Sequence, residues 1–208
     1  MSFYEKYLKY KTKYLFSDSY SFVNNLFWRR AEKHFAPGEV NLENIDLAII
    51  NAPSSYGIQP YKVFKIINQD LKIKLKPACH NQDQITECHA LYIFCAVKDY
   101  VKRIDEYVDQ TGFEFKKQSM LKYISKLSDP TEWCKRQAYI ALAFGISAAM
   151  EQRIASCPME GFEPDLISNV LQLDNNLAPC VLLTVGKQTL NYKLEARFRF
   201  KDIIEELD

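Results

Sequence analysis

The sequence has few glycines and none of the glycine-rich loops that cradle a phosphate group. Only 6 of its 208 residues are glycine, and they are scattered along the chain. No G-x-G-x-x-G fingerprint, Walker loop or G-x-S-x-G elbow occurs. If the protein binds a phosphorylated ligand, arginine and lysine side chains must therefore hold the phosphate, because no such loop is available.

Signals for metal sites, disulfides and export are also missing. The three histidines lack metal-ligand spacing, and the six cysteines include no C-x-x-C pair. No secretory signal or transmembrane segment is evident. We therefore expect buried thiols, no metal and a cytoplasmic location. The net charge of +1 favours neither nucleic acid nor an anionic surface as a partner.

The length and composition predict one globular unit. A chain of 208 residues that is 48% hydrophobic can bury a full core, and no internal repeat or linker divides it. We assign residues 21–208 to one α+β domain and residues 1–20 to a basic, aromatic N-terminal extension. Two interpretations of this extension stand open: a helix packed on the body or a frayed arm, and a membrane-surface or packaging tag. Similar Tyr/Lys-rich openings occur in proteins of large DNA viruses.

The most informative stretch is a helix and turn over residues 137–162. Residues 139–150 are all apolar or small, and small residues recur at helical spacing at Ala138, Ala141, Gly145 and Ala148. Such a helix must be buried, in a core or at a subunit interface. A short strand over 154–157 then ends at Pro158, and Gly161 lets the chain turn. The turn is either ordinary packing or a device that presents main-chain N–H groups to a ligand.

Apolar and polar spacing predicts the remaining elements. The continuous apolar run 90–97 is typical of a central strand, residues 61–67 alternate like a strand, and 179–185 form another that ends at Gly186. Residues 98–127 are polar and helical, and predict a flap of one or two helices. The Asp129-Pro130-Thr131-Glu132 sequence is a strong helix start. Further helices are expected over residues 22–30, 41–50, 71–76 and 164–171.

Basic and polar clusters lie between these elements. The first expected helix ends in a basic cluster that includes Arg29, Arg30 and Lys33, which are either a phosphate site or cations that complement the helix macrodipole. The segment 52–61 is a rigid polar loop, since two prolines bracket its hydroxyl, glycine and amide groups.

Five short motifs occur in one order and at compatible spacings. They are Arg29-x-x-x-Lys33-x-Phe35, Ala52-Pro53-Ser54-Ser55-x-x-x-Gln59-Pro60, Leu75-Lys76-Pro77-Ala78-Cys79-x-Asn81-Gln82-x-Gln84, Phe94-Cys95-Ala96 and Pro158-Met159-Glu160-Gly161-Phe162. Over residues 21–206 this series resembles the oxygen-insensitive, FMN-dependent NAD(P)H nitroreductase family. The resemblance implies a three-layer α+β sandwich with a central mixed β-sheet. It also implies an interlocked homodimer, with an FMN in each of two sites built from both subunits.

The resemblance also implies roles for individual residues. The phosphate and the pyrimidine edge of FMN would be lined by Arg29, Arg30, Ala31 and Lys33, with Arg197 as a second guanidinium at the phosphate. The other chain would contribute Ser54, Ser55 and Gly57. The ring edge or ribityl group would receive hydrogen bonds from Asn81 and Gln84. The ring would lie against Pro158, Met159, Glu160 and Gly161, with the main-chain N–H of Glu160 directed at flavin N5.

The implied activity is reduction by ping-pong hydride transfer through flavin N5. NADPH or NADH would donate the hydride, and a nitroaromatic, quinone or similar electron-poor small molecule would accept it. Two departures from the family pattern, Gly57 in place of asparagine and Glu195 in place of lysine, suggest an alternative. In that alternative the chain is a catalytically weak flavin-binding protein that retains the fold.

Overall fold

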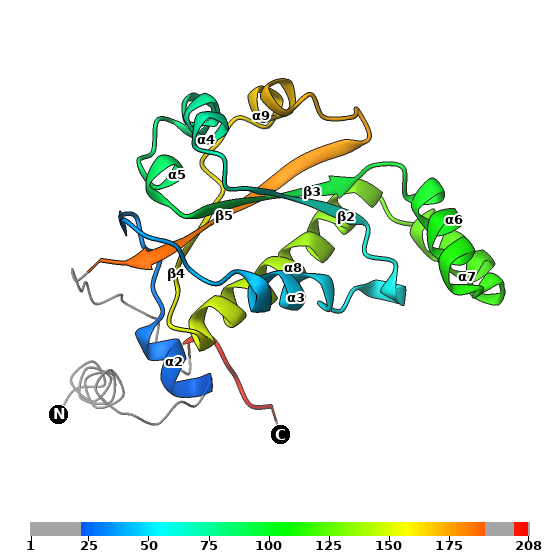
Figure 1. The fold of residues 1–208 in the computed structure, drawn as a ribbon. Coiled ribbons are helices and arrows are strands. Elements are labelled where there is room, and N and C mark those ends of the chain that lie inside the picture. Colours follow the sequence, from blue (N-terminus) through cyan, green and yellow to red (C-terminus); the bar gives the residue numbers. More distant parts are fainter. Residues whose placement is uncertain (1–21, 190–201, 208) are drawn as a thin grey trace.

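A computed structural model describes residues 22–189 and 202–207 (Figure 1). The extension 1–20 and Arg197 lie outside the described residues. The helices are α2 (Phe22–Trp28), α3 (Glu43–Ile50), α4 (Gln69–Leu75), α5 (Gln84–Glu87), α6 (Tyr100–Thr111), α7 (Glu114–Ile124), α8 (Pro130–Glu151) and α9 (Pro164–Leu171). The strands are β1 (Phe35–Ala36), β2 (Tyr61–Ile66), β3 (Ala90–Val97), β4 (Ala155–Met159) and β5 (Leu177–Gln188), and two 3₁₀ turns span Ser55–Gly57 and Pro77–Cys79.

The five strands form one sheet around β3 and β5. The strand order is β1-β5-β3-β2, and β4 also pairs with β5. The pairings between these named strands are antiparallel, and a parallel bridge joins Ala31 to Ser156. All eight residues of β3 are buried. This burial confirms that the continuous apolar run 90–97 is a central strand.

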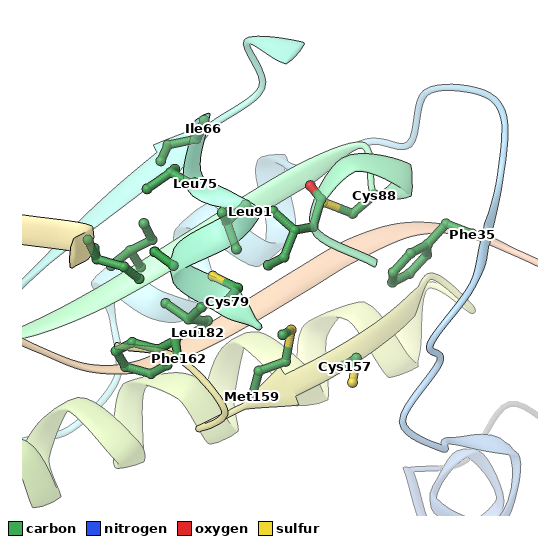
Figure 2. Close-up of a cluster of buried hydrophobic side chains, with 14 of the residues drawn as sticks. Phe35, Ile66, Leu75, Cys79, Cys88, Leu91, Cys157, Met159, Phe162 and Leu182 are labelled. Carbon is green, nitrogen blue, oxygen red and sulfur yellow. The ribbon is translucent and has the colours of Figure 1, made fainter. Parts of the chain in front are cut away.

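The sheet is the middle of three layers. In Figure 1, α3 and α8 lie on one face of the sheet, and α4, α5 and α9 lie on the other. Each face has its own apolar cluster, and Figure 2 shows the cluster beneath α4, α5 and α9. In it Met159 and Phe162 point toward Cys79 and Leu182. The expected three-layer α+β sandwich is confirmed, and Met159 and Phe162, which flank Glu160 and Gly161, are part of its core.

The long helix α8 begins and packs as its sequence predicts. The Asp129 carboxylate accepts a hydrogen bond from the main-chain N of Glu132 at 2.9 Å, directly before the first turn with its Pro130. On the small-residue face, a Cβ added to Gly145 would lie 3.0 Å from Ile49 of α3. The small residues therefore let α3 approach closely. The other face is open: Ile140 and Phe144 are 37% and 42% exposed in the single chain.

Two predicted strand ends are wrong. The strand β4 does not stop at Pro158 but continues to Met159, with Pro158 opposite Leu183. This is tolerated because, among the described residues, the side of β4 away from β5 is bridged at Ser156 and not at Pro158, so the missing N–H of proline costs no ladder bond there. Likewise β5 runs on through Gly186 to Gln188, because Phe35 of β1 packs over the bare Cα of Gly186.

The segment 98–127 forms the two helices α6 and α7, as the sequence predicted. They are separated at Gly112, which has φ 71° and ends α6 in the left-handed conformation. In Figure 1 both helices lie at one end of the sheet. Buried side chains of α6 and α7 pack there with Ile58, Ala96 and the first turn of α8. This end of the molecule thus has a small core of its own.

Candidate functional site

The turn after β4 exposes two residues between two buried anchors. Met159 and Phe162 are buried, whereas Glu160 and Gly161 face solvent. The main-chain N of Phe162 donates to the carbonyl O of Glu160 at 3.0 Å, which closes the turn. Because its ends are anchored in the core, the turn presents exposed backbone in a fixed position.

A second loop lies directly against this turn. The side-chain Nε2 of Gln82 donates to the carbonyl O of Gly161 at 2.9 Å, and the main-chain N of Glu163 donates to Ala78 O at 2.8 Å. The sequence predicted that Asn81 of this loop and Gln84, the first residue of α5, contact a ligand. Asn81 is exposed, with φ 56°, whereas Gln84 is only 5% exposed and its Nε2 donates to Gln82 Oε1 at 3.0 Å. The two residues therefore have different environments.

The basic segment after α2 runs beside the start of β4. Helix α2 ends at Trp28, two residues earlier than predicted, and Ala31 bridges to Ser156. Arg30 is 8% exposed and bonded to Glu32, with Nη2 and Oε2 2.8 Å apart. Lys33 is exposed and Arg29 is half-buried. Of the predicted cations in this segment, Lys33 and Arg29 are therefore the ones that reach the surface.

The loop with Ser54, Ser55 and Gly57 is held against α8, on the side opposite the Glu160 turn. The main-chain N of Ser55 donates to Gln137 Oε1 at 2.9 Å, and Ser54 Oγ accepts from Gln59 N at 2.9 Å. Gly57 has φ 77°. These bonds make the loop rigid, as its sequence predicted.

Two residues of α8 show that this loop and the Glu160 turn attach to different faces of the helix. Gln137 binds Ser55, whereas the Tyr139 hydroxyl donates to Glu160 Oε1 at 2.6 Å. Residues two apart on an α-helix point roughly 200° away from each other. One chain therefore does not place Ser54, Ser55 and Gly57 over its own Glu160 turn.

A cleft of about 320 Å³ opens beside Glu160. Its walls include Lys135, Arg136 and Tyr139 of α8 and Cys180 of β5. Burial, with a further contribution from the hydrogen bond to Glu160, raises the pKa of Tyr139. Burial likewise raises the pKa of the Cys180 thiol to about 11, so both groups are neutral at physiological pH.

Sequence reasoning missed three residues of this region: Gln82, Gln137 and Tyr139. Gln82 lies inside one of the five motifs. The local sequence, however, does not distinguish an amide side chain that binds a ligand from one that binds a neighbouring turn. Gln137 and Tyr139 looked like ordinary parts of an apolar helix. A polar side chain within a helix otherwise apolar was the available signal, since buried polar atoms need partners.

The layers and the strand order define a three-layer α+β protein. Its candidate functional site is the Glu160–Gly161 turn that follows β4. The sequence model of the nitroreductase family matches residues 26–187, and the chain belongs to this family. SH0546 of Staphylococcus haemolyticus, assigned as an NAD(P)H nitroreductase, is 27% identical over 88% of this chain and 95% of its own. The oxygen-insensitive NADPH nitroreductase of Helicobacter acinonychis is 24% identical over 80% of this chain and 85% of its own.

Solved structures show the same fold. YdfN of Bacillus subtilis, assigned as a nitroreductase, superposes with a TM-score of 0.82 at 18% identity, over 89% of this chain and 98% of its own. A protein of Exiguobacterium sibiricum with the same assignment, crystallised in complex with FMN, gives 0.76 at 18% identity over 91% and 99%. These matches confirm the predicted fold and family.

The residues around the Glu160 turn fit an FMN by their chemistry. FMN has a planar ring system and a phosphate group, and a turn of exposed backbone suits the ring. At Gly161 the backbone is bare, and an added Cβ would lie 3.2 Å from Gln82 Nε2. Lys33, which is exposed, and Arg29, which is half-buried, are cations of the kind that would hold a phosphate in the absence of a glycine-rich loop. Among residues 22–189 and 202–207, no cluster of potential metal ligands is present and no helix is long and apolar enough to cross a bilayer.

Proposed function

We propose that this protein is an FMN-dependent oxidoreductase that uses NADPH or NADH to reduce nitroaromatics, quinones or similar electron-poor small molecules. The observation that carries the proposal is the Glu160–Gly161 turn, two exposed residues, one of them glycine, between the buried anchors Met159 and Phe162. FMN, when bound, supplies the acceptance and donation of hydride. No side chain then has to act as a nucleophile.

The chain's own residues would bind and orient the cofactor. Arg29 holds the phosphate through its planar guanidinium, together with Arg197 from the part of the chain that the structure does not describe. Lys33 favours negative charge at the pyrimidine edge, and Asn81 donates to the ring edge or ribityl chain. The Glu160 main-chain N–H would be directed at the hydride-accepting nitrogen, N5. Arg30 and Gln84, both buried, support their neighbours.

We infer that the active unit is a homodimer. In one chain the loop with Ser54, Ser55 and Gly57 attaches to the face of α8 opposite the Glu160 turn. A second copy can supply this loop to the turn. Ile140 and Phe144 form an exposed apolar stripe on α8, and a two-fold contact through such a stripe would bury it on both subunits.

The test is the visible absorption spectrum of the purified protein, recorded before and after anaerobic addition of NADPH and then NADH. We expect a yellow protein whose flavin band bleaches with at least one donor and recovers when a quinone or nitroaromatic is added. A yellow protein that keeps its colour with both donors would support the catalytically weak flavin-binding protein instead. A colourless protein that takes up no added FMN would contradict the proposal.

A further inference from the structure

The Glu160–Gly161 turn is held from two sides by side chains that belong to other elements. Gln82, from the loop between α4 and α5, binds the carbonyl of Gly161. Tyr139, from α8, binds the carboxylate of Glu160. We propose that Gln82, oriented by Gln84, and Tyr139 are positioning residues that clamp this turn and fix the direction of its main-chain N–H groups. The consequence for flavin chemistry rests on the function proposed above.

On the first side, a buried amide determines how Gln82 is oriented. Gln84 is 5% exposed, and its Nε2 donates to Gln82 Oε1 at 3.0 Å. With its oxygen occupied, Gln82 turns its NH₂ group toward two carbonyls, Gly161 O at 2.9 Å and Cys79 O at 3.1 Å. If the Gln82 amide were flipped, its NH₂ group would face the NH₂ group of Gln84, donor against donor. Its oxygen would face the two carbonyl oxygens, acceptor against acceptor. The observed orientation is therefore the one in which every group is paired.

This bond restrains the residue with the most backbone freedom. Glycine loses more conformational freedom on folding than any other residue, so an unsupported Gly161 would let the adjoining peptide planes rotate. The Gln82 amide binds the Gly161 carbonyl and also packs against its Cα, where an added Cβ would lie 3.2 Å from Gln82 Nε2. Gln82 thus fixes the plane of the peptide that follows Gly161.

On the second side, a tyrosine from α8 holds Glu160. The Tyr139 hydroxyl lies 2.6 Å from Glu160 Oε1 and 3.3 Å from the carbonyl O of Cys180. Because the pKa of Tyr139 is raised, its hydroxyl keeps the proton that it donates. The side chain of Glu160 is thereby tied to Tyr139 of α8, and Tyr139 itself contacts β5 at Cys180. A bond of this kind gives the side chain of Glu160 a role although its main chain faces the cofactor.

Together the two contacts make the turn a preorganised group of dipoles. Hydrogen-bond donors held in place before the reaction stabilise developing charge without the cost of reorganisation. A looser turn would still bind a flavin through its phosphate, but its N–H groups would be directed less well at the ring. The clamp should therefore affect the reactivity of the flavin more than the amount bound.

The test uses isosteric variants with matched controls. Gln82→Met removes the amide that binds Gly161, and Tyr139→Phe removes only the hydroxyl that binds Glu160. Gln69→Met is the control for the first, because Gln69 Nε2 donates to the Thr86 carbonyl at 3.0 Å away from the turn. Tyr92→Phe is the control for the second, because the Tyr92 hydroxyl donates to the Asp46 carboxylate at 2.8 Å.

The first measurement is amide hydrogen exchange of residues 159–163 in the FMN-free protein. Each clamp variant should exchange there about fivefold faster than the unmodified chain, the factor expected for one lost hydrogen bond. The double variant should exchange faster than either single variant, and the departure from the product of the two factors measures the coupling of the two contacts through the turn. Both controls should leave this segment unchanged. Unchanged exchange in Gln82→Met and Tyr139→Phe would overturn the clamp.

The second measurement is the midpoint potential of the bound flavin and its rate of bleaching by the pyridine nucleotide. We expect a lower potential and bleaching about fivefold slower in each clamp variant, at nearly unchanged flavin content. Faster exchange with unaltered potential and bleaching would overturn the role in flavin chemistry. If the unmodified protein takes up no FMN, the proposed function fails, whereas the exchange measurement still decides whether the clamp exists.

Discussion

Arg29 and Arg30 are adjacent in the chain but have different roles. Arg30 is buried against Glu32, whereas Arg29 is half-buried beside the region proposed for the FMN phosphate. We expect Arg29→Ala to fold normally but to bind FMN about ten- to hundredfold more weakly, because charge-assisted hydrogen bonds are lost. Fluorescence titration with FMN measures this affinity. Lys74→Ala, which removes an exposed cation from α4, is the control, and equal affinity in the two variants would contradict the phosphate assignment.

Such a distinction was only partly accessible from sequence. The motif predicted a ligand-binding role for Arg29, Arg30 and Lys33 alike, yet Arg30 is paired with Glu32. In an extended segment, residues two apart lie on the same side, so Glu32 was a readable partner for Arg30. Gln84 gave no such signal. Its burial and its bond to Gln82 depend on how α5 packs against the sheet, which no local pattern records.

At the scale of elements, β5 depends on a contact with β1. A Cβ added to Gly186 would lie 2.8 Å from Phe35 Cδ1 and 3.1 Å from the main-chain N of His89. Gly186→Ala should therefore lower the free energy of unfolding by about 1–3 kcal/mol, as overpacking does. Urea unfolding measures the change. Adding Phe35→Leu should recover part of the loss, and an unaltered unfolding midpoint in Gly186→Ala would contradict the close approach.

The elements were predictable where their signals are local. Asp129 and Pro130 fixed the start of α8, and the apolar run 90–97 fixed β3. Two strand ends were not predictable in this way. Proline at 158 ends a strand only when its missing N–H is needed by a neighbour, and glycine at 186 ends one only when nothing packs over it. Both conditions are set by strand order and by Phe35, more than 100 residues away in sequence.

At the scale of the whole molecule, the proposed dimer depends on the exposed face of α8. Phe144→Asp places a charge on this face, where burial against a second copy would cost desolvation. We expect this variant to be monomeric in analytical ultracentrifugation and to lose most of its FMN. Phe115→Asp is the control, since Phe115 of α7 is 76% exposed and lies outside this face. A dimeric Phe144→Asp protein with normal FMN content would rule out this interface.

The cysteines make the stability of the whole chain sensitive to alkaline pH. Burial raises the pKa of Cys88 to about 11 and that of Cys95 and Cys134 to about 12, from an ordinary value of 9.0. Below pH 9 these thiols are protonated in both states, so their contribution is complete. Between pH 9 and pH 12 the unfolded chain ionises first, so the free energy of unfolding falls with rising pH.

Each such thiol should remove up to about 1.4 kcal/mol per pH unit in this window. Urea unfolding under a reductant at pH 8.0 and pH 10.0 measures the loss. Cys134→Ala should show a smaller loss between these two pH values than the unmodified chain. Equal losses would mean that the Cys134 thiol ionises as readily in the folded protein as in the unfolded chain.

Two strands with an edge outside the main ladder, β2 and β4, give the protein a defence against aggregation. Open strand edges are templates for pairing with other chains, and lysine and proline on such edges oppose it. On β2 the exposed Lys62 and Lys65 place charge along one edge, and on β4 Pro158 removes a donor from the other. In the part of the chain that the structure describes, growth of the sheet into fibrils is thereby discouraged along both of these strands.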